Sequence, residues 1–356
     1  MKSEKQSSKQ IIIQSIGTAN PSCARILEDS LKLPQELVLK QLYNAPSVLF
    51  PNVEFELATE LKKQLTKLGL EIELKDTTEQ IHFSKENYEV SINVQEIKNL
   101  PYVLKSMSDF LGTSIQECVQ LLGDERRVVI GGVSKATALA MKKRIPAAIC
   151  YTNPKLDAYT IRFDDAIPDQ VVQTLLTSGI QKSQINLTRR QICNLDYQQS
   201  QKIWNNYHSQ NGIQIINQSH QIISLELVDF DLNNQNHINF LNKSIGIPQE
   251  VLPQIHANTP VVLFENITRH NSMELIQTLD DLSMDYRIKE VDVSPKFIEA
   301  SDIEDQIEFQ NVMNQFFNLN AKTNVKHWRS ERKVPFVIAM YIQDQLQSIN
   351  CKVKMN

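Results

Sequence analysis

Histidines are the side chains of this sequence best suited to bind a metal ion, but their spacing does not fit that role. Metal sites built from one stretch of chain use patterns such as H-E-x-x-H or C-x-x-C, because the side chains must reach one ion together. None of the seven histidines stands at such a spacing from another His, Cys or Glu: His82, His208, His220, His237, His256, His270 and His327. We therefore predict no metal site and no bound cofactor.

Paired carboxylates could support general acid–base catalysis, and there are two pairs, Asp164-Asp165 and Asp280-Asp281. The first pair precedes "AIPDQVV" and is typical of a helix start, where the helix dipole favours negative charge. Catalysis would require burial or a charged partner to shift a carboxyl pKa. The sequence has no G-x-S-x-G motif and no glycine cluster for a phosphate loop. We predict that the chain is not an enzyme; the alternative is an enzyme with a cleft between repeated units.

Two basic clusters favour a different partner, nucleic acid. The first cluster would lie in one segment of the chain and consists of Arg126, Arg127, Lys142, Lys143 and Arg144. The second, "KHWRSERK", interleaves Trp328 with cations, as surfaces that stack on RNA bases do. It also fits an exposed strand edge protected by charge. The net charge is −4, so no global positive field supports nucleic-acid binding, and we keep it as the alternative.

The sequence contains an internal repeat that predicts how these residues are positioned. "LPQELVLKQLYNAPSVLFPNV" and "IPQEVLPQIHANTPVVLFENI" share a Pro-Gln-Glu triplet, an Asn and a second Pro in register. Between them, "VVIGGVSKATALAMKKRI" aligns with "VLFPNVEFELATELKKQL", and "QICNLDYQQSQKIWNNYHSQ" is a weaker copy. Correspondence over this length without a gap indicates tandem units of one fold.

One unit reads as β-α-α-β-α-β. "QIIIQSIG" is a strand, and "SCARILEDSLKL" and "PQELVLKQLYN" are helices. "SVLF" is expected to be the central strand, and "EFELATELKKQLTKLG" a helix with Leu57, Ala58, Leu61, Leu65 and Leu68 as its buried stripe. In "LEIELKD", apolar and charged residues alternate, which is typical of a strand with one solvent-exposed face. The predicted fold class is α+β (an α/β sandwich): tandem units, each a small antiparallel sheet covered on one face by three helices.

Polar and Pro-containing connecting segments indicate where one unit ends and the next begins. We expect residues 1–9 to be disordered and a linker at 77–87. The units would span 10–76, 88–153, 158–218 (a degenerate copy) and 219–292, followed by a C-terminal extension, 293–356, with the helix-then-strand shape of half a unit.

The first unit resembles the C-terminal domain of the bacterial ribosomal stalk protein. "LKLPQELVLKQLYNAP" and "ELATELKKQLTKLGLEIELK" carry the resemblance, which extends over 10–76, 220–292 and more loosely 88–152. The Clp-protease adaptor family looks like the same fold. The resemblance implies protein binding without catalytic residues. In the stalk family, lysines on the helix before the turn recruit GTPases. Glu36 and Leu39 stand at those positions here, and Glu250 and Pro253 in the last copy, so that particular partner is not expected.

The same helix is the best candidate for a protein-binding surface. If Leu37 and Leu42 point inward, Glu36, Lys40 and Tyr43 share an outward stripe, with Leu39 at its edge. A Tyr beside a Leu is the kind of anchor that interfaces use. The alternative is that Tyr43 packs against the second unit instead.

Composition indicates the cellular compartment of the protein and whether it spans a membrane. Five widely separated cysteines are typical of reduced thiols in a cytoplasmic protein. The start of the chain lacks the apolar run of a signal peptide, and "VPFVIAMYI" is too short to cross a bilayer. We predict a cytoplasmic, bacterial, non-enzymatic adaptor or scaffold that binds protein partners in a larger assembly. The alternative is a ribosome- or RNA-associated protein that uses the basic second unit.

Overall fold

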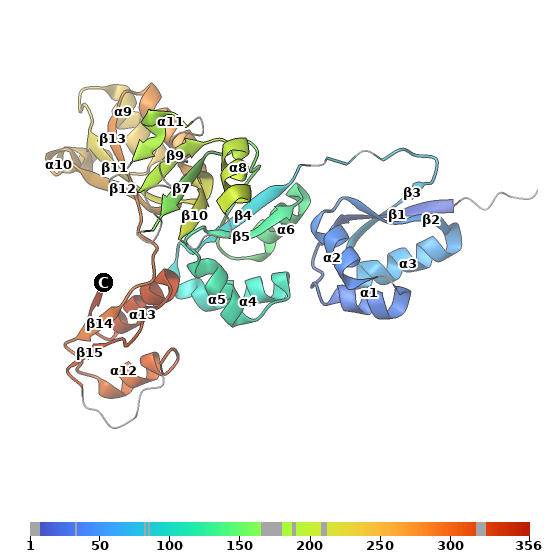
Figure 1. The fold of residues 1–356 in the computed structure, drawn as a ribbon. Helices are drawn as coiled ribbons and strands as arrows, with labels where there is room; N and C mark the ends of the chain where they lie inside the picture. Colours follow the sequence, from blue (N-terminus) through green and yellow to red (C-terminus); the bar gives the residue numbers. More distant parts are fainter. Residues whose placement is uncertain are drawn as a thin grey trace, which may run out of the picture. The chain divides into compact units, whose positions relative to one another are not determined.

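The computed structural model (Figure 1) is an α+β protein built from small antiparallel sheets and the helices that pack on them. Its described residues contain five such sheets, one in each of five successive segments, which we call modules one to five. The structure describes residues 8–32, 34–81, 83–84, 86–164, 180–186, 190–207, 212–317 and 325–356. Within these residues, no helix is both long enough and apolar enough to cross a membrane.

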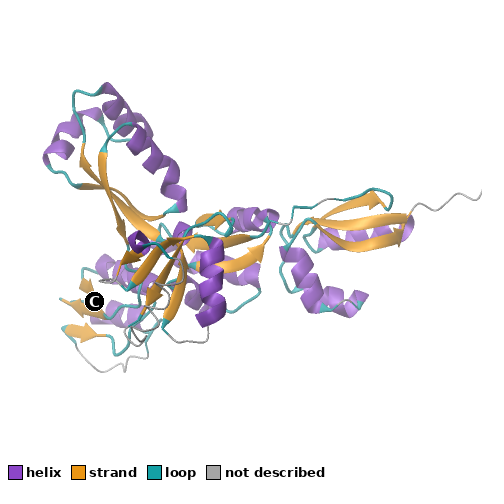
Figure 2. Cartoon of the chain, turned by 45° about the horizontal axis from the view of Figure 1, so that its top comes forward, coloured by secondary structure: helices purple, strands orange, loops and turns teal. Residues whose placement is uncertain are grey.

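Module one has the predicted element order. Its elements are β1 (Ser8–Ser15), α1 (Cys23–Leu31), α2 (Gln35–Tyr43), β2 (Ser47–Glu54), α3 (Phe55–Lys67) and β3 (Glu71–Asp76). The strand order is β2-β1-β3, and both pairings are antiparallel. The helices lie on one face of the sheet in both views (Figures 1 and 2). Gly69, with φ +95°, lets the chain turn from α3 into β3.

The sheet order corrects one prediction. The "SVLF" strand lies at the edge of the sheet, and β1 is central. β1 has a hydrogen-bonded neighbour on each side, and its three isoleucines, Ile11, Ile12 and Ile13, are fully buried. Module four repeats this order, because β12, the second copy of "SVLF", is also an edge strand beside a central β11.

Modules two and four follow the same plan. Module two consists of β4 (Tyr88–Asn93), η1 (Ile97–Asn99), α4 (Leu100–Leu111), α5 (Ile115–Gly123), β5 (Val128–Val133), α6 (Lys135–Arg144) and β6 (Ala148–Thr152). Module four consists of β11 (Ile222–Asp229), α9 (Gln235–Asn239), η4 (Phe240–Ser244), η5 (Gln249–Val251), α10 (Leu252–Ala257), β12 (Val261–Thr268), η6 (His270–Ser272), α11 (Met273–Asp281) and β13 (Asp285–Glu290). In both modules one and four, the peptide bond before the repeated proline, Pro46 or Pro260, is cis.

Module three, the degenerate copy, keeps the sheet and adds a strand. It contains β7 (Tyr159–Phe163), η2 (Lys182–Gln184), β8 (Ile185–Asn186), β9 (Gln191–Leu195), α8 (Tyr197–Tyr207), β10 (Ile213–Asn217) and η3 (Gln218–His220). The order β10-β7-β9-β8 again places the first strand of the module between its neighbours.

Module five is more than the half unit expected for the C-terminal extension. It has three strands in the order β15-β14-β16 and two described helices. Its elements are β14 (Ile298–Ser301), α12 (Gln306–Met313), β15 (His327–Arg329), α13 (Phe336–Ser348) and β16 (Lys352–Met355).

One small residue marks the register in every module. We call the helix between the last two strands of a module its third helix. The small residue lies in the first turn of this helix or, in module four, just before it. Its side chain is fully buried in all five cases: Ala58, Ala138, Ser200, Ser272 and Ala339. A small side chain at this point lets the helix approach the sheet closely without a void or a clash. The buried stripe predicted for α3 is partly wrong, however, because Leu57 beside Ala58 is exposed.

The five modules belong to two compact lobes. The first lobe comprises Met1–Asp124, Val128–Asn153 and Ser294–Asn356, and the second comprises Glu125–Arg127 and Pro154–Val293. Modules one, two and five therefore form the first lobe, and modules three and four form the second. The side chains of the first lobe share one apolar core, which runs through its three modules.

Candidate interaction site

Tyr43, the last residue of α2, lies at the junction of modules one and two. Its carbonyl oxygen accepts hydrogen bonds from the backbone N–H of Ser134 (3.0 Å) and from Oγ1 of Thr137 (2.8 Å), at the start of α6. Its hydroxyl lies 3.5 Å from the carbonyl oxygens of Phe110 and Leu111 in α4. Of the two placements considered from the sequence, Tyr43 therefore has the one in which it packs against the second unit.

Arg144, the last residue of α6, closes the same junction from the other side. Its Nη1 donates hydrogen bonds to the carbonyl oxygens of Gly17 (3.3 Å) and Ala19 (2.6 Å), in the loop after β1. Its guanidinium carbon lies 4.8 Å from the ring centroid of Phe110, close enough for a cation–π interaction. Burial lowers the pKa of Arg144. This cation therefore binds module one rather than facing solvent.

Two ionisable groups beside Arg144, Tyr43 and Cys23, are neutral at this junction. Burial raises the pKa of the Tyr43 hydroxyl to about 12, with the nearby Cys23 adding to the shift. Burial also raises the pKa of the Cys23 thiol to about 11. A nucleophilic thiol needs the opposite shift, toward the thiolate at neutral pH. The junction of Tyr43, Cys23 and Arg144 is thus suited to holding modules together and not to nucleophilic chemistry.

A second junction, between modules two and five, uses the equivalent positions. Gly123 ends α5 as Tyr43 ends α2, and Pro335 precedes α13 as Ser134 precedes α6. A Cβ added at Gly123 would lie only 2.7 Å from Cβ of Pro335, so Gly123 packs directly against the proline ring. In both junctions, the C-terminal end of a second helix contacts the N-terminal end of a third helix in another module.

The exposed face of α2 differs from the predicted one by a small rotation. Val38 and Leu42 are buried, whereas Leu37, expected to point inward, is 45% exposed. Glu36 and Lys40 are exposed, and Leu39 is half-buried against the core of the first lobe. We call Glu36, Leu37 and Lys40 the α2 face. It replaces the stripe that included Tyr43.

The basic residues proposed for nucleic acid do not share one environment. Arg126, Lys142 and Lys143 are exposed, but Arg127 is only 8% exposed and Arg144 is held by module one. Arg126 and Arg127 belong to the second lobe, and Lys142, Lys143 and Arg144 to the first.

Trp328, the aromatic residue of the other basic cluster, is packed within module five. Its ring contacts those of Phe309 (centroids 6.2 Å apart) and Phe317 (5.1 Å), both edge-on. It is half-buried, so its faces are not open in the way that stacking on a base requires. The exposed cations around it fit the charged strand edge, the structural alternative for this segment.

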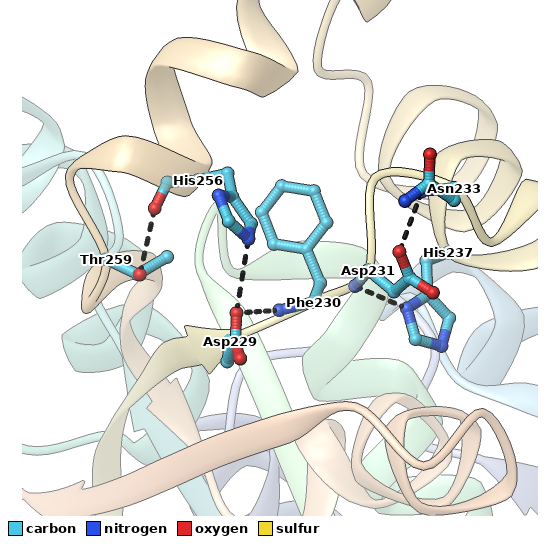
Figure 3. A network of polar contacts seen from close by, with 7 residues as sticks. All are labelled: Asp229, Phe230, Asp231, Asn233, His237, His256 and Thr259. Atoms are coloured by element: carbon cyan, nitrogen blue, oxygen red, sulfur yellow. Dashed lines mark hydrogen bonds and ion pairs between the residues drawn. The ribbon is translucent and has the colours of Figure 1, made fainter.

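Histidines and carboxylates in the second lobe form a polar network at one end of module four (Figure 3). Nδ1 of His237 accepts a hydrogen bond from the backbone N–H of Asp231 (3.0 Å). Its Nε2 must therefore carry the proton, which it donates to the carbonyl oxygen of Leu282 (2.9 Å). His256 faces Asp229 at 3.4 Å and lies edge-on to Phe230, at the more exposed rim. The buried His237 thus links the end of β11 to the end of α11.

Replacing His237 with phenylalanine should lower the free energy of unfolding of module four by about 1–2 kcal/mol. The ring volume is kept, but the Asp231 N–H and the Leu282 carbonyl lose their partner. Urea unfolding followed by circular dichroism measures the change, and faster hydrogen exchange of the Asp231 amide locates it. His256→Phe, at the rim, is the matched control and should change stability by no more than about 0.5 kcal/mol. Equal effects of the two substitutions would contradict this role.

The other histidines and aspartates considered for chemistry either form hydrogen bonds within the fold or lie outside the described residues. Asp280 accepts a hydrogen bond from the Tyr286 hydroxyl (2.8 Å), and Asp281 accepts one from Gln277 (2.8 Å). Asp165, His82 and His208 lie outside the described residues. In the part of the chain that is described, no three His, Cys, Asp or Glu side chains are grouped so as to hold a metal ion.

Sequence reasoning missed two exposed apolar side chains at the start of α3, Phe55 and Leu57. A helical stripe pattern cannot reveal them, because it assigns apolar residues to the core whenever their spacing allows.

The chain was compared with protein-family models, curated proteins and solved structures, and no match was found in any of the three.

Proposed function

We propose that this chain is a non-enzymatic scaffold that binds protein partners through surfaces of its repeated modules. The observation that carries the proposal is the twice-used contact between helix ends: Tyr43 on the start of α6, and Gly123 on the start of α13. A fold that joins its own modules through helix ends offers the same kinds of surface to other proteins. The neutral Tyr43 and Cys23 at the first junction support packing over catalysis.

The α2 face is the proposed site for a protein partner. Leu37 supplies an apolar anchor, and Glu36 and Lys40 flank it with opposite charges. An interface commonly combines a desolvated apolar centre with a polar rim of this kind. The resemblance to the ribosomal stalk domain points to the same helix, but with Glu36 and Leu39 in place of the family's lysines. The expected partner therefore presents a small apolar pocket with charges of both signs.

Replacing Leu37 with aspartate should weaken partner binding at least tenfold without changing the melting temperature by more than a few degrees. The tagged full chain would be used to isolate partners from the cell that makes it, and binding of a purified partner would then be measured by calorimetry. Leu139→Asp is the matched control, because Leu139 is also exposed but lies on α6. A partner that binds the Leu37→Asp chain as tightly as the original would remove the α2 face from the proposal.

The ribosome- or RNA-associated alternative now depends on fewer residues. Lys142 and Lys143 are exposed next to each other on α6. Two cations can neutralise about two phosphates, and log Kobs for binding would then fall by only about two units per tenfold rise in salt. This is a weak and sequence-independent contact, so we favour a protein partner.

A further inference from the structure

One position at the start of the third helix is covered in two modules of the first lobe and uncovered in the remaining one. In module two it is Thr137, which is fully buried and donates to the carbonyl oxygen of Tyr43. In module five it is Ile338, 7% exposed, in a helix whose start contacts Gly123. In module one the equivalent residue is Leu57, which is 55% exposed. Module one thus has the receiving half of the repeated junction without its usual occupant.

The uncovered position is apolar, like the buried Ile338. Phe55, two residues earlier, is exposed as well. Its ring is approached by Nζ of Lys9, 5.7 Å from the centroid. Exposed apolar patches rimmed by polar residues mark protein contacts. We call Phe55 and Leu57, with the helix start that carries them, the α3 end.

The matching half of the junction is a second-helix end, and α10 in module four has the required form. Asn44, just after α2, donates from its side chain to the carbonyl oxygen four residues back, of Lys40 (2.9 Å). Asn258, just after α10, does the same to Gln254 (2.7 Å). The docked end of α2 and the end of α10 are therefore terminated in the same way, and in register.

The end of α10 is also accessible and small. Ala257, the equivalent of Tyr43 and Gly123, is exposed, and so is Asn258. A small last residue permits a close approach like the one that Gly123 makes to the Pro335 ring. We call Ala257 and Asn258 the α10 end.

We propose that the α10 end of one copy of this chain docks on the α3 end of a second copy, which extends the junction already used within the first lobe. The two surfaces are different, so the contact is heterologous. Each chain carries both the α10 end and the α3 end, so association continues head to tail unless a ring closes. This inference does not depend on the α2 face, because Leu37 and Leu57 lie on different helices.

A crosslinking experiment tests which surfaces meet. Two full-length variants, Leu57→Cys and Ala257→Cys, are prepared with tags of different size in a Cys193→Ser background, because Cys193 is the one native cysteine that is not buried. Mild oxidation should give a mixed disulfide when the two variants are combined, and no crosslinked dimer from either variant alone. The inference is overturned if Leu57→Cys dimerises with itself, if the mixture stays uncrosslinked, or if a chain carrying both substitutions crosslinks only within itself.

Sedimentation velocity tests the association without cysteines. The average mass of the original chain should rise with concentration and should not stop at a dimer unless a ring closes. Leu57→Asp should weaken this association at least tenfold, while Leu139→Asp, at an exposed position on α6, should leave it unchanged. Circular dichroism checks that both variants are folded. A monomeric original chain at all concentrations, or an unchanged mass distribution for Leu57→Asp, would refute head-to-tail assembly.

Discussion

Replacing Arg144 with methionine should lower the free energy of unfolding of the first lobe by about 2–4 kcal/mol. The methionine keeps most of the apolar stem but removes two hydrogen bonds from a charged donor, to the carbonyl oxygens of Gly17 and Ala19. Hydrogen bonds to charged groups contribute about 1.5–3 kcal/mol each, and the Phe110 contact adds about 0.5–2. Because the site is partly open to solvent, these contacts are screened, and we expect the loss to stay below their sum, at about 2–4 kcal/mol.

The two tryptophans allow each lobe to be followed separately. Trp328 lies in the first lobe and Trp204 in the second, so a Trp204→Phe background makes urea-induced fluorescence changes report the first lobe. The Ser134 amide, which donates to Tyr43 across the junction, should exchange faster with solvent in the Arg144→Met chain. Lys143→Met is the control, since Lys143 is exposed and should matter by no more than about 0.5 kcal/mol. If both variants lost the same stability, the role assigned to Arg144 would be wrong.

Local sequence signals were sufficient to predict the elements of module one. The isoleucine run of β1, the helical spacing around Leu42 and Leu65 and the glycine at position 69 each carry their own physical reason. The repeat then transferred these elements to modules two, three and four. The α+β class of the whole chain followed from that transfer.

Strand order and helix rotation could not be obtained in the same way. Which strand is central depends on pairing between distant segments, and "SVLF" is as apolar as many central strands although it lies at an edge. On α2, Leu37 and Val38 are adjacent and both apolar. Since successive residues of a helix differ by about 100°, only the packing of the helix decides which of them is buried.

Contacts between modules could not be predicted from the sequence either. In "KKR", Lys142, Lys143 and Arg144 look alike as a charged run, and only the position of module one selects Arg144 for burial. The final segment lacks the Asn-x-Pro turn of the first and fourth units, and for that reason its sheet was recognised only in part. Leu57 was assigned to the core because its spacing fits the helical stripe, and nothing in the sequence indicates that it is exposed.

His220 makes the stability of the second lobe depend on pH. It ends η3, between the last strand of module three and the first strand of module four, and its side chain is fully buried. Asp157 lies nearby and accepts hydrogen bonds from Asn217 and Ser219 (both 2.7 Å). Burial lowers the pKa of His220 to about 4. Asp157 opposes this shift, and His270, on the neighbouring η6, adds to it.

Acidification should therefore destabilise this lobe by about 3 kcal/mol through His220 alone. The unfolded chain binds a proton at His220 below a pKa of about 6.5, but the folded chain does so only below about 4. Between these values the unfolded state holds more protons, so stability falls as the pH falls. Above about pH 6.5 the ring is neutral in both states and contributes no pH dependence. Below about pH 4 it is charged in both states, and its contribution to the loss is complete.

Urea unfolding in a Trp328→Phe background, where Trp204 reports the second lobe, measures this loss between pH 7.5 and pH 4. Carboxylates also begin to titrate near the acid end, so the quantity to compare is the pH dependence of the original chain minus that of His220→Gln, which has no titrating group at this position. That difference should reach about 3 kcal/mol at the lowest pH. His256→Gln, at the exposed rim of module four, is the matched control and should retain the part of the loss that depends on His220. Parallel stability curves for the original chain and His220→Gln would show that the buried imidazole takes up its proton as easily in the folded state as in the unfolded one.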